Sequence, residues 1–87
     1  MVGERIATMA LYKFGDYLQK SQSDAFDVEH KAGDDAPYSA IYRCGGCGQE
    51  VVSDDHRPLP GKSHHQHTIH QGPIRWRLVV AANGKLG

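Results

Sequence analysis

The chain has 87 residues, of which 39% are hydrophobic and 23% charged, and its formal net charge is zero. This length leaves room for one domain, whose small core gains from an additional staple such as a bound metal ion. The balanced charge argues against a basic nucleic-acid-binding domain, and no apolar run reaches the ~20 residues that span a membrane. Two cysteines are too few for a disulfide framework.

The first residues do not predict a secretory signal, because Glu4 comes early and no continuous apolar region follows. We therefore expect a cytoplasmic protein, in which a close pair of cysteines indicates metal binding or redox chemistry rather than a structural disulfide.

Residues 4–20 carry apolar side chains three and four apart, a spacing typical of one face of a helix, although Gly15 weakens the pattern. We expect residues 1–30 to form an N-terminal extension that is either a helix or a flexible segment. Residues 21–37 are polar, with breakers near their end, and predict a linker or loop. The apolar positions are Ile6, Met9, Ala10, Phe14, Tyr17 and Leu18.

Two strand-prone stretches flank a glycine-rich turn in the middle of the chain. Tyr38, Ile41 and Tyr42 lead into Cys44, and residues 49–53 follow the turn. This order predicts a β-hairpin with the cysteines at its tip. Residues 54–73 contain three prolines and two glycines and predict a loop.

Residues 74–82 predict a third strand, because apolar Ile74, Trp76 and Leu78 alternate with arginines at positions 75 and 77. We expect Trp76 to pack with Tyr42 on the inner face of the small sheet. Residues 31–87 thus predict one small β-rich domain, a hairpin plus a third strand.

Cys44 and Cys47 are separated by two glycines and followed by Gly48. Two intervening residues let one tight turn direct both thiolates to one zinc ion. Glycines let such a turn adopt positive φ and bring backbone N–H groups near the sulfurs. A thioredoxin-like redox pair would need a βαβ unit, which the chain does not predict. The other alternative is a pair of thiols without any ligand role.

Four histidines lie in residues 64–70, which read HHQHTIH. Neutral imidazole is a good zinc ligand, so two of them would complete a site with the cysteines. Two histidine pairs, His64 with His67 and His67 with His70, reproduce the two-residue gap of the cysteines. We select His64 and His67 as ligands, with His65 and His70 as alternates. The other interpretation is that these histidines only decorate or order a surface loop.

From residue 31 onward the chain carries K-x-G-D-x-A-P-x-S, a tyrosine before the CxxCG turn, a Leu-Pro pair and a Trp-x-Leu strand. This order resembles short bacterial zinc-ribbon proteins of poorly known role. The resemblance implies a zinc-ribbon fold around Zn²⁺. The chain departs from it at Ala40, at Gly61 and at the second knuckle, where histidines replace a cysteine pair. The matching positions are Lys31, Gly33, Asp34, Ala36, Pro37, Ser39, Tyr42, Cys44, Cys47, Gly48, Leu59, Pro60, Trp76 and Leu78.

The run DDHRPL at residues 54–59 resembles the start of an HNH endonuclease, which implies a general-base role for His56. Such a site also needs a downstream asparagine and a metal-binding histidine on a helix. The one asparagine, Asn83, follows a predicted strand instead. We expect the isolated histidines His30 and His56 not to bind metal.

These patterns favour a structural zinc module that acts in binding or as an adaptor and is not an enzyme, because four protein ligands leave no position for a substrate. One alternative is a metal-dependent hydrolase or HNH-like nuclease. Another is nucleic-acid binding through Arg75 and Arg77, helped by Arg43 and Lys62. The sequence identifies no partner, although a protein is one candidate, and we expect no membrane association.

Overall fold

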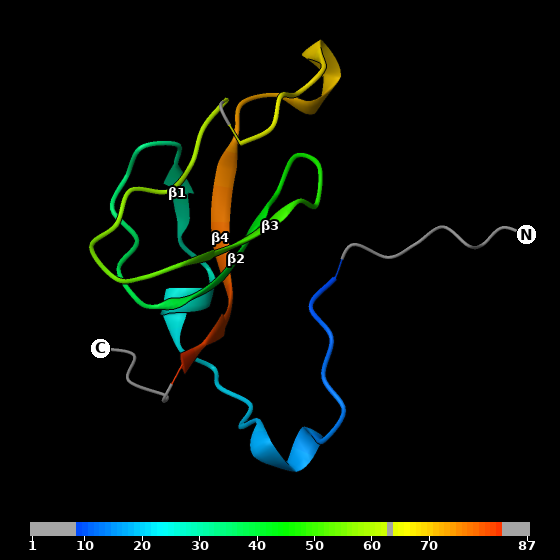
Figure 1. Ribbon diagram of the computed structural model, residues 1–87, viewed down its shortest axis with the longest axis vertical. Coiled ribbons are helices and arrows are strands. Elements are labelled where there is room, and N and C mark those ends of the chain that lie inside the picture. Colours follow the sequence, from blue (N-terminus) through cyan, green and yellow to red (C-terminus); the bar gives the residue numbers. More distant parts are fainter. Residues whose placement is uncertain (1–8, 63, 83–87) are drawn as a thin grey trace, which may run out of the picture.

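The computed structural model describes residues 9–62 and 64–82, which form a four-stranded antiparallel sheet (Figure 1). The spatial order of the strands is β1-β4-β2-β3, so β4 pairs with both β1 and β2. The predicted β-rich fold, a hairpin joined by a third strand, is confirmed. The strands are β1 (Glu29–Lys31), β2 (Ala40–Cys44), β3 (Glu50–Ser53) and β4 (Arg75–Ala81), and the 3-10 turns are η2 (Gly15–Tyr17), η3 (Asp24–Phe26) and η4 (Ile69–Gln71).

Burial alternates along β2 and the first half of β4, as the sequence predicts for half-buried strands. On β4, Trp76 and Leu78 are buried whereas Arg77 between them is exposed. Tyr42 on β2 lies opposite Leu78 and is buried with it. The core therefore lies on one face of the sheet. Its buried members are Ala36, Ala40, Tyr42, Cys44, Leu59, Trp76 and Leu78.

Two loops meet at this core. The N–H of Gly33 donates to the carbonyl of Leu59, and the N–H of Leu59 donates to the carbonyl of Asp34, both at 2.8 Å. The indole N–H of Trp76 donates to the carbonyl of Pro60 at 2.9 Å. The Leu-Pro pair of the loop after β3 is thereby attached both to the loop before β2 and to the buried tryptophan.

β1 was not predicted, because residues 21–37 were expected to form a linker or loop. The strand has only three residues, and two of them, Glu29 and Lys31, are exposed and charged. It forms because β4 offers a free edge, with His30 opposite Trp76. Glu29 then pairs with Arg75 at 3.2 Å and with Arg77 at 3.3 Å. The division of the chain into an extension (residues 1–30) and a domain (31–87) stays a prediction.

The helix expected over residues 4–20 does not form in its described part, residues 9–20, where the regular element is the single turn η2. The large apolar side chains of the stripe within the described part remain exposed, for example Phe14 at 58% and Tyr17 at 85%. A short helix without a packing partner is marginal in water, and Gly15 lowers its propensity further. Residues 1–8, including Ile6, lie outside the described part of the chain. Figure 1 shows the segment from residue 9 running outside the sheet.

Tyr42→Phe is expected to destabilise the fold. The buried Tyr42 hydroxyl donates to the carbonyl of Tyr38 at 2.7 Å and accepts from its N–H at 3.2 Å. Losing both bonds inside the core should lower the free energy of unfolding by about 1–3 kcal/mol. The matched control is Tyr17→Phe, at a tyrosine 85% exposed. Thermal unfolding measures both variants, and an unchanged Tm for Tyr42→Phe would contradict the assigned role of the hydroxyl.

Candidate metal centre

The two cysteines occupy the turn between β2 and β3. Cys44 is the last residue of β2; its N–H donates to the carbonyl of Gln49, and its carbonyl accepts from the N–H of Gly48, both at 2.8 Å. Gly48 has φ of +83°, the left-handed conformation expected directly after the second cysteine. Positive φ does not extend to Gly45 and Gly46, contrary to the sequence expectation.

Gly46 has a different role, which is to make room. A Cβ atom at Gly46 would lie 2.6 Å from the carbonyl oxygen of Gln71 and 2.8 Å from Cε1 of His67. The loop that carries the histidines therefore packs directly on the backbone of the cysteine turn. This close approach brings Nε2 of His67 to 3.3 Å from Sγ of Cys44.

His65 completes a group of four metal-ligating side chains. Its Nε2 lies 3.1 Å from Nε2 of His67. One donor atom from each of Cys44, Cys47, His65 and His67 lies within 4.8 Å of all the others. Cys44 is buried, and the other three are partly buried. Among residues 9–62 and 64–82 this is the one group of three or more such side chains in that geometry.

The orientation of His67 suits it to bind a cation. Its Nδ1 lies 2.7 Å from the carbonyl oxygen of Gly72. A carbonyl only accepts, so Nδ1 carries the hydrogen and, in the neutral ring, Nε2 presents its lone pair to the group. Gly72, with φ of +72°, directs that carbonyl from the turn that follows η4.

Two distances within the group are close to those between the ligand atoms of a tetrahedral zinc site. Zn–N bonds of about 2.0–2.1 Å and Zn–S bonds of about 2.3 Å imply tetrahedral edges of roughly 3.3–3.7 Å between ligand atoms. The N···N distance of 3.1 Å and the S···N distance of 3.3 Å lie within a few tenths of an ångström of those edges. Two sulfurs and two imidazole nitrogens are also the donor set that zinc prefers.

The electrostatics of the two thiols differ. Burial raises the pKa of Cys44, but hydrogen bonds, chiefly from neighbouring backbone groups with that of Arg75 first, outweigh it and lower the pKa to about 6. Burial, followed by the proximity of Cys44, raises the pKa of Cys47. Two thiolates at this spacing repel each other, so a cation placed between them would favour the ionised form of both.

The structure brings together three of the four ligands predicted from the sequence, Cys44, Cys47 and His67. The fourth place is taken by His65, which the sequence analysis named as an alternate. His64 lies next to the group, with its Nδ1 2.8 Å from Nδ1 of His65. His70 sits in η4, outside the group. The ligand role of each histidine stays a prediction.

The local backbone conformation explains why His65 rather than His64 joins the group. The two-residue gap between His64 and His67 matches that of the cysteine turn and would suit a second tight turn. Residues 65–67 form no helix or turn, however, and Thr68 after them is extended with ψ of 169°. In such a chain, residues two apart project to the same side. The pair His65-x-His67 therefore fits one ion without a second tight turn.

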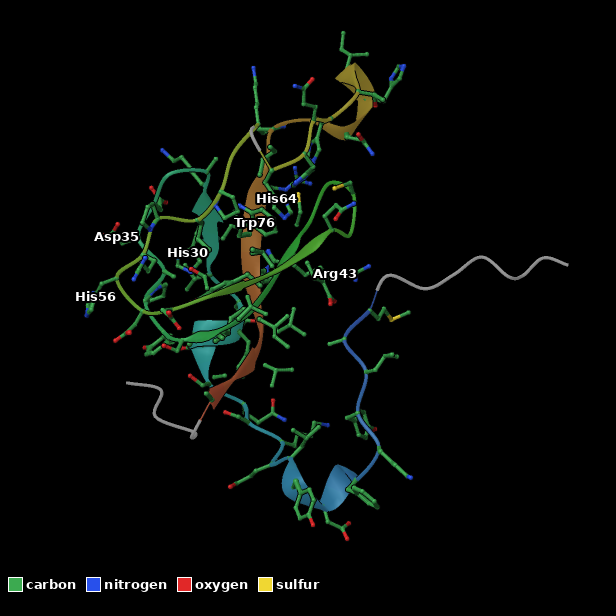
Figure 2. The ribbon with its side chains drawn as sticks, in the orientation of Figure 1. His30, Asp35, Arg43, His56, His64 and Trp76 are labelled. Atoms are coloured by element: carbon green, nitrogen blue, oxygen red, sulfur yellow. The ribbon has the colours of Figure 1, made fainter. Side chains whose placement is uncertain are left out.

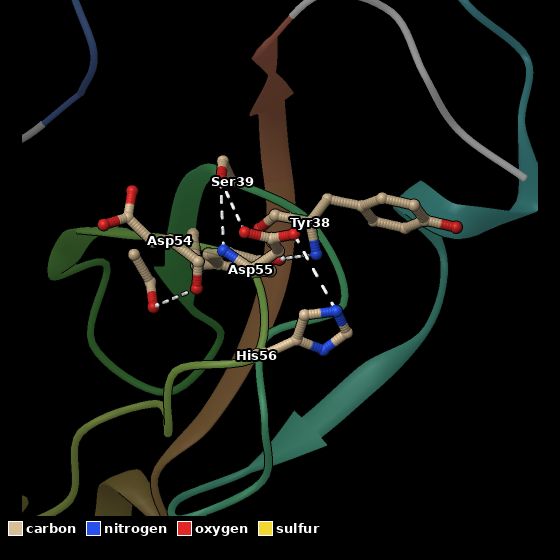
Figure 3. A network of polar contacts seen from close by, with 7 residues as sticks. Tyr38, Ser39, Asp54, Asp55 and His56 are labelled. Atoms are coloured by element: carbon tan, nitrogen blue, oxygen red, sulfur yellow. Dashed lines mark hydrogen bonds and ion pairs between the residues drawn. The ribbon is translucent and has the colours of Figure 1, made fainter.

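The residues that suggested a nuclease hold a loop in place. The N–H of Asp55 donates to Oγ of Ser39 at 3.0 Å, and Ser39 Oγ donates back to the Asp55 carboxylate at 3.3 Å (Figure 3). Nε2 of His56 lies 3.8 Å from the same carboxylate, and His56 has φ of +65°. His56 is well separated from His64 and Trp76 in Figure 2. Asn83 lies outside the described residues.

The arginines that suggested nucleic-acid binding are paired with carboxylates. Arg75 and Arg77 share Glu29 as described above, and Arg43 lies 3.3 Å from Glu50. These ion pairs lower the positive potential of the protein surface around the arginines, and a nucleic-acid-binding surface requires such a potential.

In residues 9–62 and 64–82, no helix has the length and apolar character needed to span a bilayer.

Comparison with known proteins assigns the chain to a family. No family model matches it, and no solved structure matches it either. A protein of Escherichia coli named Protein L is 39% identical over 71 residues, which cover 79% of this chain and 80% of that protein. Neither comparison identifies the chain as a zinc ribbon, so the similarity to bacterial zinc-ribbon proteins stays a resemblance in sequence pattern. Because the identity extends over most of both chains, this chain belongs to the same family as Escherichia coli Protein L.

Proposed function

We propose that the protein is a structural zinc-binding module, with Cys44, Cys47, His65 and His67 as its ligands. The observation that carries the proposal is the convergence of two sulfurs and two imidazole nitrogens within 4.8 Å. These donors come from two distant segments, the β2–β3 turn and the loop before β4. An ion held between them would crosslink those segments, which is how a metal stabilises a domain with a small core.

Four protein donors leave no coordination position open for a substrate, which favours a binding or adaptor module over an enzyme. The metal would supply stability and a fixed loop geometry rather than chemistry. Both cysteines are free thiols. Ligation by thiolates suits a reducing compartment, so the proposal includes a cytoplasmic location.

Titration with Co²⁺ and Zn²⁺ tests the proposal. We expect one ion per chain, a Co²⁺ absorption spectrum of two thiolates in tetrahedral coordination, and displacement of Co²⁺ by Zn²⁺. Fluorescence of Trp76, the one tryptophan of the chain, should report the same event because the ring of His65 packs edge-on against it at 5.6 Å between centroids. The proposal would be refuted if the purified protein contained no metal and its Tm changed with neither EDTA nor added zinc.

A further inference from the structure

His64 occupies a defined place beside the candidate metal centre. Its ring meets the ring of His65 edge-on at 5.0 Å between centroids and that of Trp76 edge-on at 5.7 Å. Trp76 is fully buried and is fixed by its hydrogen bond to Pro60. Figure 2 shows His64 beside Trp76. An otherwise exposed histidine is thus held against a rigid part of the core.

The hydrogen bond between the two histidines constrains the tautomer of His65. The two Nδ1 atoms lie 2.8 Å apart, so one of them donates and the other accepts. The other nitrogen of His65, Nε2, faces the donor group at 3.1 Å from Nε2 of His67. For Nε2 of a neutral ring to offer a lone pair to a cation, the hydrogen of that ring must be on Nδ1. Nδ1 of His64 is then the acceptor.

We infer that His64 is a positioning residue of the metal centre: by accepting the Nδ1 hydrogen of His65, it holds that ring in the tautomer and orientation that present Nε2 to the ion. The inference rests on the proposed metal-binding function. The Gly72 carbonyl does the same for His67 at 2.7 Å, so each imidazole of the group has its own hydrogen-bond acceptor. Such partners of metal-ligating histidines are worth about 10- to 100-fold in metal affinity.

Three variants separate this role from others. His64→Phe keeps an aromatic ring against Trp76 but removes the acceptor. His64→Asn loses the ring but places an amide oxygen near the position of Nδ1. His70→Phe is the matched control, because His70 belongs to the same run but lies outside the group of four. His64 is exposed, so none of these changes opens a cavity in the core.

The measurement is the affinity for Co²⁺, by competition with a chelator, together with the Co²⁺ absorption spectrum. We expect His64→Phe to weaken binding about 10-fold with an unchanged spectrum, His64→Asn to recover most of that loss, and His70→Phe to match the wild type. Unchanged affinity in His64→Phe would overturn the inference. So would a spectrum that shows one nitrogen ligand fewer, because His64 would then be a ligand itself. A wild-type chain that binds no Co²⁺ would refute the proposed metal-binding function itself. A wild type that binds Co²⁺ with an affinity that His64→Phe leaves unchanged would refute only the role of His64.

Discussion

Cys44→Ser is expected to remove the metal-dependent part of the stability of this protein. Cys44 is fully buried, and its sulfur lies 3.3 Å from Nε2 of His67. A serine hydroxyl is not ionised at neutral pH and is a poor zinc ligand, so the group would keep three donors. At free zinc 100 times above Kd, binding adds about 2.7 kcal/mol to the free energy of unfolding. That contribution corresponds to roughly 10–20 °C in Tm for a domain of this size.

The comparison is the Tm of each protein in EDTA and in excess zinc. The wild type should show the difference, and Cys44→Ser should show almost none. His70→Phe is the control, since it should keep the full zinc response. A Cys44→Ser protein whose Tm still rises with zinc by the wild-type amount would mean that the metal binds elsewhere.

Gly46→Ala is expected to separate the two halves of the metal centre. The new methyl group would lie 2.6 Å from the carbonyl oxygen of Gln71 and 2.8 Å from the ring of His67. The first neighbour is backbone, and the second is held by its bond to Gly72, so neither moves freely. We expect a loss of about 1–3 kcal/mol in stability from overpacking. Displacement of His67 should also weaken zinc binding by about 10- to 100-fold.

Gly45→Ala is the matched control in the same turn. Its Cβ would meet Nε of Arg75 at 3.3 Å, in a side chain that can shift. Neither glycine has positive φ, so backbone strain does not distinguish the two variants. Zinc affinity and Tm should therefore stay close to the wild type for Gly45→Ala and fall for Gly46→Ala. Equal behaviour of the two variants would contradict the close packing of the histidine loop on Gly46.

The cysteine turn and the pairing of β2 with β3 were accessible from the sequence because their signals are local. Alternation of Trp76 and Leu78 with Arg77 identifies a half-buried strand whatever its partner. The C-x-x-C-G order identifies a turn from five consecutive residues. The hairpin of β2 and β3 follows, since its strands adjoin that turn.

β1 and the N-terminal segment were not accessible, because their conformation depends on partners elsewhere. Glu29–Lys31 is a strand only because β4 supplies a free edge and two arginines for Glu29. The spacing that predicts a helix over residues 4–20 is present in the sequence, but Met9, Phe14 and Tyr17 in the described part of that stretch stay more than half exposed. Helix formation in so short a segment depends on tertiary packing more than on propensity.

The sequence by itself determined the thiolate half of the candidate site, Cys44 and Cys47, since two residues of spacing and Gly48 suffice to converge two sulfurs. Only the tertiary structure decided which histidines meet them. The run HHQHTIH offers several pairs of equal chemistry, and its local spacing favoured His64 with His67. The choice of His65 with His67 depends on the packing of the loop against Gly46 and Trp76, together with the Gly72 carbonyl that orients His67. These contacts join segments far apart along the chain, and no local spacing encodes them.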